Sequence, residues 1–297
     1  MKKGLKRPLE LAIEIASSKP YTISFSEGHE PRIVEAAVEA VNLGIAKIIL
    51  VGKVEKVKHQ LAKYPCSYPD RIKIHDPTRS SLIKEFSKSY YELRKHKGIT
   101  YEDAKKQATS NLVYAALLVK NGHADGTLSG AVETTSNVVK TAIWVLGKAT
   151  QVKTVSSCFL IFPKSHEPMI YADCGLVIEP NDEELVDITI AASQSCKSLL
   201  NTDPRIALLS FSTKGSAKHR NTDKILSALK KLKSLEPELL VDGELQFDAA
   251  LDSAVGKIKA PESKVAGTAN VMIFPNLDAG NIAYKITQRL GNADAYG

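Results

Sequence analysis

Blocks of apolar residues at helical spacing and short apolar runs follow one another along the first half of the chain. Residues 8–17 (PLELAIEIAS) place apolar side chains on one helical face, and residues 21–25 (YTISF) are typical of a short strand. The next helix is predicted from Pro31 to Gly44, because proline favours the first helical turn and glycine the end, and the apolar run 46–52 predicts another strand. Alternating helices and strands predict a mostly parallel sheet covered by helices.

A capped helix is predicted from Thr100 to about Val119. Thr100 and Asp103 have the spacing of a capping box, in which each side chain accepts a hydrogen bond from the other residue's backbone N–H. A basic cluster, Arg94 to Gly98 (RKHKG), comes just before this helix. From charge alone, we interpret them as a solvated turn.

The pattern changes about halfway along the chain, where we place a domain boundary between residues 1–150 and 151–297. Residues 153–178 contain apolar runs separated by short turns instead of by helices. Helices and strands then alternate again, beginning with a helix that Asn181 or Asp182 caps. The predicted fold is therefore α/β, with two domains of mostly parallel sheets covered by helices.

Composition narrows the class of protein without changing this fold. The 297 residues are 43% apolar and 25% charged, which is typical of a globular protein. The formal charge of +7 favours an anionic partner, but the cations are spread along the chain without interleaved aromatic residues. We therefore expect small phosphorylated ligands and no nucleic acid. A nucleic-acid-binding protein is a lower-ranked alternative that rests on net charge alone.

Cysteine usage and hydropathy indicate a cytoplasmic protein. The cysteines are far apart and form no CxxC motif, and no apolar leader begins the chain. They are Cys66, Cys158, Cys174 and Cys196. No stretch approaches the roughly 18 apolar residues of a membrane span. We therefore expect a reduced, cytoplasmic protein with no membrane association.

Four predicted strands run into turns rich in glycine, hydroxyl and amide groups. These turns cover residues 25–28, 127–135, 210–218 and 274–281. In open parallel sheets, ligands bind beyond the carboxyl ends of the strands, where helix N-termini attract anions. Hydroxyls and amides can donate to phosphate oxygens, and glycine lets a ligand approach the backbone. Ordinary loops have the same composition, so the four turns together favour a site more than any one of them does.

No nucleotide-binding or metal-binding motif accompanies these turns. Neither G-x-x-x-x-G-K-[ST] nor a G-x-G-x-x-G after a strand occurs. No histidine has metal-ligand spacing to another histidine or to a cysteine, so we expect no metal. Asp242, Glu244, Asp248 and Asp252 gather in one stretch that could hold a divalent ion, although helix caps and surface charge explain these carboxylates equally well.

Five segments, taken together, resemble the phosphate acetyltransferases. They are ELRKHKGIT, ADGTLSGAVETT, ALLSFSTKGSA, VDGELQFDAA and ESKVAGTANVMIFPNLDAGNIAYKITQRLG, and they occur in the family's order along nearly the whole chain. The resemblance implies a two-domain α/β fold with the active site in the cleft between the domains. It also implies a homodimer with no tightly bound cofactor or metal, which uses coenzyme A, acetyl phosphate and phosphate as substrates.

The reaction that the resemblance implies is the reversible transfer of an acetyl group between coenzyme A and inorganic phosphate. The coenzyme A thiolate attacks the carbonyl carbon of acetyl phosphate, and cationic donors stabilise the oxyanion and the departing phosphate. One alternative is a phosphate butyryltransferase, a type of enzyme that shares the pattern less closely. Another is a non-catalytic or weakly active homologue that still binds coenzyme A or phosphate.

The resemblance also assigns individual residues. Arg94, Lys140 and Arg289 fall on positions implied to be catalytic. The positions implied to bind substrate are Ser129, Gly130, Thr134, Thr135, Ser212, Thr213, Lys214, Ser216 and Lys285. Lys140 stands where the family usually has an arginine, so it keeps the charge and lacks the bidentate fork that suits phosphate.

Other positions depart from the family's pattern. Ser26 and Thr141 stand where the family usually has prolines, and Glu133 stands where it usually has a histidine. Family members continue past the position of Gly297 into a segment that carries a Ser-Arg-Gly motif and an aspartate assigned as general base. That segment also completes the first domain, so the resemblance leads us to expect a shortened chain.

Overall fold

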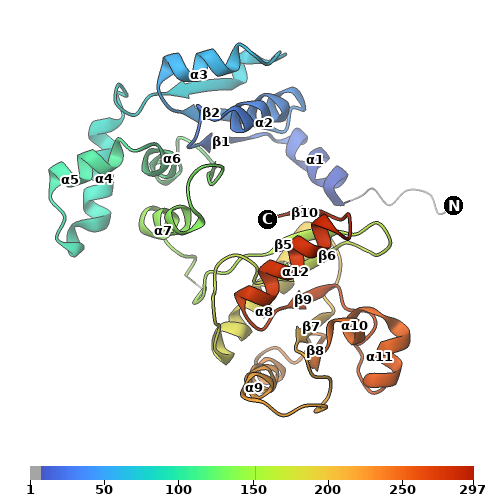
Figure 1. Ribbon diagram of the computed structural model, residues 1–297. Helices are drawn as coiled ribbons and strands as arrows, with labels where there is room; N and C mark the ends of the chain where they lie inside the picture. The colour runs from blue at the N-terminus through green and yellow to red at the C-terminus, as the bar shows by residue number, and fades with distance from the viewer. Residues whose placement is uncertain (1–7, 151) are drawn as a thin grey trace. The chain divides into compact units, whose positions relative to one another are not determined.

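The computed structural model describes residues 8–150 and 152–297. They form two compact units that divide between Lys148 and Ala149, and each unit is built around one sheet (Figure 1). Within these residues, no helix is both long and apolar enough to cross a membrane.

The first unit contains a four-stranded sheet of order β3-β2-β1-β4, in which every pairing is parallel. Ile23 of the inner strand β1 pairs with Ile48 of β2 on one side and with Gly126 of β4 on the other. The elements in chain order are α1 (Pro8–Ser18), β1 (Tyr21–Phe25), α2 (Pro31–Asn42), β2 (Ala46–Val51), α3 (Val54–Leu61), β3 (Ile72–His75), α4 (Ile83–Arg94), α5 (Tyr101–Ala108), α6 (Asn111–Lys120), β4 (Gly126–Leu128) and α7 (Thr135–Val145).

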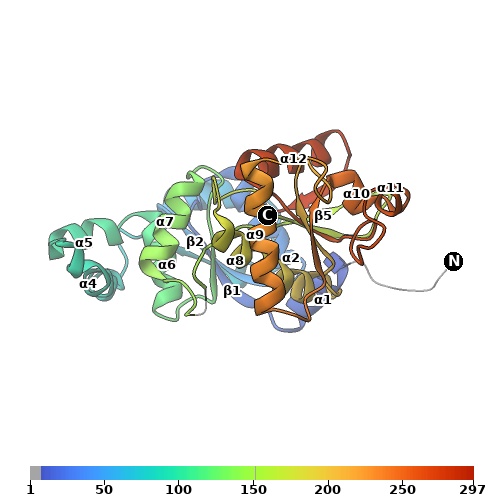
Figure 2. The same ribbon diagram turned by 90° about the horizontal axis from the view of Figure 1, so that it is seen from below.

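Both faces of this sheet are buried, as the consecutive apolar residues of β2 require. Ile48 and Leu50 pack with the buried face of α2, whereas Ile49 and Val51 pack with α6. A strand covered on both faces has a continuous apolar run instead of an alternating one. Figures 1 and 2 show α4 and α5 as a pair beside α6, and Phe86 of α4 joins the cluster that α6 forms.

The prediction of one helix from Thr100 to about Val119 is wrong, because this stretch forms two helices, α5 and α6. Ser110 interrupts it with extended backbone (φ −75, ψ 139), and its hydroxyl accepts the Val113 N–H at 3.3 Å, which caps α6. The capping box at the start of α5 is confirmed. Thr100 Oγ1 accepts the Asp103 N–H at 3.1 Å, and the Asp103 carboxylate accepts the Thr100 N–H at 3.0 Å.

The second unit contains a six-stranded sheet of order β10-β5-β6-β9-β7-β8. β5 is antiparallel to both of its neighbours, and the pairings from β6 to β8 are parallel. The elements in chain order are β5 (Phe159–Phe162), β6 (Met169–Ala172), α8 (Asp182–Ser195), a π-helical turn (Cys196–Leu200), β7 (Ile206–Leu209), α9 (Arg220–Leu235), β8 (Val241–Leu245), α10 (Phe247–Leu251), α11 (Ser253–Lys259), β9 (Val271–Ile273), α12 (Leu277–Arg289) and β10 (Asp294–Tyr296).

Helices cover both faces of this second sheet. Ile206 and Leu208 of β7 pack with α8 and α9, whereas Ala207 and Leu209 belong to the cluster on the other face with Ala250 of α10. The predicted α/β fold with mostly parallel sheets covered by helices is confirmed. Of the two residues predicted to cap α8, Asn181 does so, because its side chain accepts the N–H groups of Glu183 and Glu184.

Candidate functional site

The predicted turns 25–28 and 127–135 meet at one edge of the first sheet. β1 and β4 are parallel neighbours, so their carboxyl ends lie at the same edge. The Ser26 N–H donates to the Leu128 carbonyl oxygen at 3.2 Å and joins the two turns directly. This is the place where open parallel sheets bind ligands.

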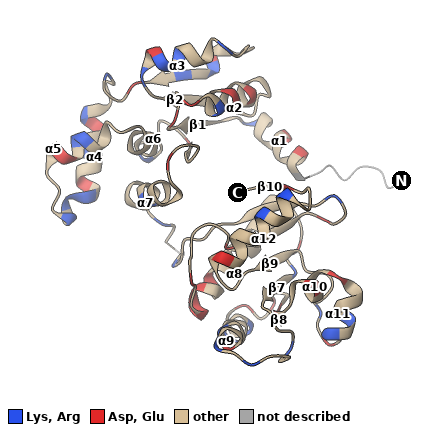
Figure 3. Ribbon diagram, in the orientation of Figure 1, with Lys and Arg blue, Asp and Glu red and all other residues tan. Residues whose placement is uncertain are grey.

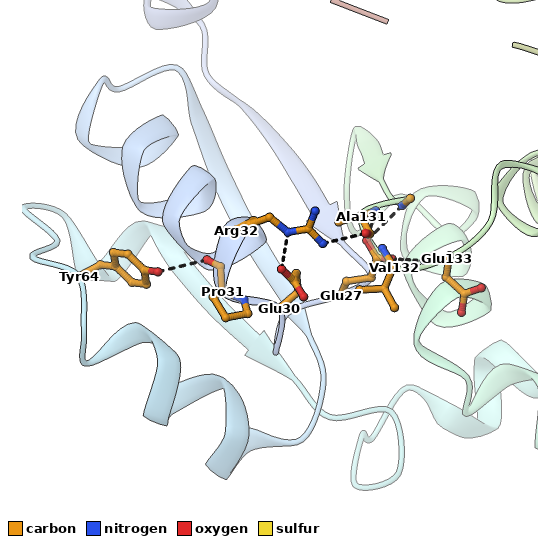
Figure 4. A network of polar contacts seen from close by, with 9 residues as sticks. Glu27, Glu30, Pro31, Arg32, Tyr64, Ala131, Val132 and Glu133 are labelled. Carbon is orange, nitrogen blue, oxygen red and sulfur yellow. Dashed lines mark hydrogen bonds and ion pairs between the residues drawn. The ribbon is translucent and has the colours of Figure 1, made fainter. Parts of the chain in front are cut away.

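The carboxylate of Glu27 lies inside the turn that follows β4 (Figure 4). Its oxygens accept hydrogen bonds from the backbone N–H groups of residues 130–133, at distances between 2.7 and 3.1 Å. Burial by itself would raise the pKa of this carboxyl, but the N–H donors outweigh burial and hold the pKa below its ordinary value. The turn predicted to bind phosphate therefore directs these amides at a carboxylate of the chain itself.

Arg32 holds the same turn from α2. Its Nε pairs with Glu30 Oε1 at 2.6 Å, and its Nη2 donates to the Ala131 carbonyl oxygen at 2.9 Å (Figure 4). At the start of α2, the Tyr64 hydroxyl donates to the Pro31 carbonyl oxygen at 3.5 Å. The turn is thus fixed through a carbonyl group as well as through its N–H groups.

A pocket of about 310 Å³ lies next to this turn. Its lining includes Ser26 and Glu27 after β1, and Asn137, Lys140 and Trp144 on α7. The Ser26 hydroxyl is buried and makes no hydrogen bond to any described residue. Because buried hydroxyls are nearly always paired in proteins, an unpaired hydroxyl beside the pocket is unusual.

The four predicted residues of the turn after β4 differ in what they can offer a ligand. Ser129 Oγ is buried and has no partner among the described residues. Gly130 has φ 114, which favours glycine, and its N–H is one of the donors to the buried carboxylate. Thr134 Oγ1 accepts the Asn137 N–H at 3.2 Å and caps α7. Thr135, the first residue of α7, is exposed.

Arg94 and Lys140 come together at the ring of Trp144. Arg94 ends α4, which contacts α7, and Lys140 and Trp144 are one helical turn apart on α7. The Arg94 guanidinium carbon lies 4.1 Å from the centroid of the Trp144 ring, and Lys140 Nζ lies 5.5 Å from it. In the described part of the chain, neither cation has a carboxylate partner. Two of the residues implied to be catalytic therefore lie beside the pocket.

In the second unit, the predicted turn 210–218 directs its hydroxyls inward. Ser212 is fully buried, and its Oγ donates to Glu244 Oε1 at 2.8 Å. The Gly215 N–H donates to the same oxygen at 2.7 Å, and Ser216 Oγ shares a hydrogen bond with Ser212 Oγ at 3.2 Å. Glu244, on the neighbouring strand β8, satisfies these groups, and no local sequence signal indicates this contact.

Thr213 and Lys214 are engaged with β8 and the residue after it. Thr213 Oγ1 donates to Gln246 Oε1 at 3.3 Å and accepts the Gln246 N–H at 2.9 Å. Lys214 Nζ pairs with Asp242 Oδ1 at 2.5 Å. Burial would raise the pKa of Asp242, but Lys214 and neighbouring donors hold it below its ordinary value. The side chains of Thr213 and Lys214, like those of Ser212 and Ser216, therefore bond to other residues of the chain.

The carboxylates from Asp242 to Asp252 serve separate purposes. Asp248 pairs with Lys259 at 2.8 Å, and Asp252 caps α11 by accepting two backbone N–H groups. Within residues 8–150 and 152–297, no three histidine, cysteine, aspartate or glutamate side chains gather as metal ligands would. Helix capping therefore explains Asp252 and ion pairing explains Asp248 and Asp242, whereas the buried Glu244 accepts hydrogen bonds from Ser212 and Gly215.

Lys285 and Arg289 lie one turn apart on α12, where Figure 3 shows basic positions. Lys285 Nζ donates to Asn281 Oδ1 at 2.8 Å. Arg289 is exposed in the last turn, and no described carboxylate pairs with it. At its other end, α12 packs so closely on the loop after β6 that a Cβ at Gly280 would collide with the Asp173 carbonyl oxygen.

Two residues of the first-unit site were missed by sequence reasoning. Trp144 carried a usable signal, because it is the only tryptophan of the chain and follows Lys140 at helical spacing. Glu27 carried none beyond its place in the turn after β1, because its partners are the amides of residues 130–133, about a hundred residues away.

Comparison with known proteins identifies the family. The model of the phosphate acetyl/butaryl transferase family matches residues 9–297. The phosphate acetyltransferases of Thermoanaerobacterium thermosaccharolyticum and Acetivibrio thermocellus are 41% and 42% identical over 294 residues, which cover 97% of this chain and 89% and 88% of those proteins. A phosphotransacetylase crystal structure from Streptococcus pyogenes superposes with a TM-score of 0.90 at 37% identity, covering 99% of this chain and 89% of that one.

The matched residues extend over both units. They confirm the resemblance that the five sequence segments indicated. The chain belongs to the phosphate acetyl/butaryl transferase family.

Proposed function

We propose that this protein transfers an acetyl group reversibly between coenzyme A and inorganic phosphate. Family membership supports this reaction, and one feature of the site is the main structural support for the proposal. Arg94 and Lys140, from two different helices, lie together beside the pocket without carboxylate partners among the described residues. Cations without counter-ions bind anions such as phosphate and acetyl phosphate well, because no internal ion pair must be broken first.

In the direction of acetyl-coenzyme A formation, the thiolate of coenzyme A attacks the carbonyl carbon of acetyl phosphate. A carbon–sulfur bond forms, and the carbonyl oxygen becomes an oxyanion. The carbon–oxygen bond to phosphate then breaks, and its electron pair leaves with the phosphate. Both charges develop on oxygen, so fixed cationic donors stabilise them more than they stabilise the bound substrate.

We propose roles in this reaction for residues that line the pocket or lie close to it. Arg94 offers its fork of N–H donors to two phosphate oxygens, and Lys140 adds a single point charge. The free hydroxyls of Ser26 and Ser129 donate to remaining phosphate oxygens. Thr135 is exposed at the start of α7, where the N-terminus of the helix also favours an anion.

In the second unit, we propose that Lys285 and Arg289 bind the anionic substrates. Arg289 is exposed and has no described carboxylate partner, which suits this role. Ser212, Thr213, Lys214 and Ser216 shape the turn after β7, since their side chains bond to other residues of the chain.

The test of this proposal is an assay that follows the loss of free thiol when purified protein is mixed with acetyl phosphate and coenzyme A. We expect turnover, and we expect Arg94→Gln to lower kcat/KM by about a hundredfold and Lys140→Gln by about tenfold. Arg71→Gln is the matched control, because Arg71 also stacks on an aromatic ring, that of Tyr68, at 4.9 Å. No turnover above a buffer blank, or equal losses in the Arg94 and Arg71 variants, would contradict the proposal.

Acyl preference is a separate question, because the family description includes both acetyl and butaryl transfer. We propose that acetyl is preferred, since the most similar relatives described above are phosphate acetyltransferases. Comparing kcat/KM for acetyl phosphate and butyryl phosphate tests this. A higher value for butyryl phosphate would assign the chain to the butyryl reaction.

We also propose that the protein is a cytoplasmic homodimer that uses coenzyme A as a substrate and needs no tightly bound cofactor. The cysteines support a reducing compartment, because all four are free thiols. Sedimentation equilibrium tests the dimer: we expect a species of twice 32.3 kDa. A species of 32.3 kDa at micromolar concentration would overturn that part of the proposal.

A further inference from the structure

Arg94 lies over the ring of Trp144 and makes no side-chain hydrogen bond to a described residue. The guanidinium carbon lies 4.1 Å from the ring centroid, within the range of a cation–π contact. All five N–H donors of an arginine lie at the edge of the group, in its plane. No described residue accepts a hydrogen bond from the Arg94 guanidinium. The tryptophan therefore fixes the position of this cation without using any of its donors.

A carboxylate in place of the Trp144 ring would hold Arg94 at the cost of its ability to bind an anion. An ion pair would occupy two of the donors and neutralise the charge that an incoming anion needs. The pair of the exposed Lys214 and the buried Asp242 in the second unit shows this arrangement within the same protein. The ring of Trp144 holds Arg94 at a much smaller electrostatic cost to anion binding, because the charge of the guanidinium is retained.

Trp144 also faces Lys140, whose Nζ lies 5.5 Å from the same centroid. Two cations near one ring repel each other, and the negative face of the indole offsets part of that repulsion. Trp144 is 38% exposed and lines the pocket. One side chain therefore sets the positions of both cations at the edge of the space that an anion would enter.

We infer that Trp144 is a positioning residue that holds Arg94 and Lys140 in place for the phosphate group of the substrate. The kinetic consequences of this inference rest on the proposed function. The effect of Trp144 on anion binding does not. Trp144 does not touch the reacting atoms, so its loss weakens substrate binding more than it slows the chemical step. Trp144 is also a fluorescent reporter of the site, because it is the only tryptophan of the chain.

The kinetic experiment compares Trp144→Leu and Trp144→Phe with the wild-type protein. Leucine removes the π face, and we expect KM for acetyl phosphate to rise about fivefold with kcat unchanged within about twofold. Phenylalanine keeps a weaker π face, so the KM of Trp144→Phe should lie between those of the wild-type protein and Trp144→Leu. In the Arg94→Gln background, Trp144→Leu should add a smaller change than in the wild-type protein, because only the contact with Lys140 is left to lose.

Tyr68→Leu is the matched control, since it removes the ring that contacts Arg71 outside the pocket. It should leave KM and kcat at their wild-type values. A merely structural role for Trp144 would lower kcat together with the thermal unfolding midpoint, and it would add its full effect in the Arg94→Gln background. Either of those results would overturn the inference.

The second experiment does not need turnover. Inorganic phosphate is titrated into the protein, and the fluorescence of Trp144 is followed alongside calorimetry. We expect the emission to change with the binding isotherm, because indole emission responds to the positions of nearby charges. Arg94→Gln and Lys140→Gln should each weaken binding and reduce the emission change, and Tyr68→Leu should alter neither.

The two experiments separate the inference from the proposed function. Phosphate binding that changes Trp144 emission in a protein without turnover would refute the acetyltransferase proposal and support the positioning role. Turnover together with calorimetric phosphate binding that leaves the emission unchanged would refute the positioning role and leave the acetyltransferase proposal intact.

Discussion

Replacing Glu27 with glutamine removes a charge from a nearly filled set of hydrogen bonds. Oε2 accepts the N–H groups of Gly130 and Ala131, and Oε1 accepts those of Val132 and Glu133. A glutamine has only one acceptor oxygen, and its NH₂ group would face two N–H donors in either orientation. Two charge-assisted hydrogen bonds at about 1.5 kcal/mol each give an expected loss of about 3 kcal/mol in the free energy of unfolding.

The same substitution should change how stability depends on pH. The pKa of Glu27 in the folded protein lies below the ordinary value of 4.5. A lowered pKa means that the carboxylate stabilises the fold above the pKa of the unfolded chain, and that this contribution is lost as the pH falls through the folded pKa. The stability difference between wild type and Glu27→Gln is therefore complete at neutral pH and shrinks below about pH 4.

Urea unfolding followed by the fluorescence of Trp144 measures this loss, because Trp144 lies in the same unit. Hydrogen exchange adds a local readout, and the amides of residues 130–133 should exchange faster in the variant. Glu30→Gln is the matched control: Glu30 pairs with Arg32 at the surface and accepts none of these amides. If both variants lose the same stability, or if the amides keep their protection in Glu27→Gln, the reasoning is refuted.

Other parts of the structure give further tests. Asn181→Ala removes the cap of α8 and should cost about 1 kcal/mol by urea unfolding, a result contradicted by an unchanged midpoint. Gly280→Ala places a methyl group against the Asp173 carbonyl oxygen, so it should lower stability by about 2 kcal/mol or more, and a variant as stable as wild type would show that the close packing of α12 is not required. Burial raises the pKa of the Cys174 thiol, so mass spectrometry should find it alkylated at least about tenfold more slowly than the partly exposed Cys66 at pH 8, and equal rates would contradict its burial.

The fold could be predicted where its signals are local. The continuous apolar run of β2 and the proline and glycine that bound α2 are readable within a few residues of sequence. The break between α5 and α6 was missed because apolar spacing continues across it, and the capping role of Ser110 depends on an extended backbone conformation. A sequence pattern cannot distinguish a serine within a helix from a serine that begins a new one.

The candidate site was less predictable, because its defining contacts join distant segments. Arg94 and Lys140 could be named from the family resemblance, but their shared contact with Trp144 requires α4 to pack on α7. The turn after β7 was predicted to offer free hydroxyls, and Glu244 on β8 satisfies the buried Ser212 hydroxyl instead. Composition indicates which groups can donate, whereas only the tertiary structure determines which of them already have acceptors.

Glu27 gives the turn after β4 a permanent internal anion, and this affects how a substrate is bound. A turn whose amides had no internal acceptor would become ordered only when phosphate bound, and it would lose conformational entropy at each binding event. Here that ordering is completed during folding, so the turn is preorganised before any substrate arrives. Under the proposed function, recognition of the anion then depends on side chains, above all Arg94 and Lys140. Single substitutions can therefore retune anion selectivity while the backbone of the site keeps its shape.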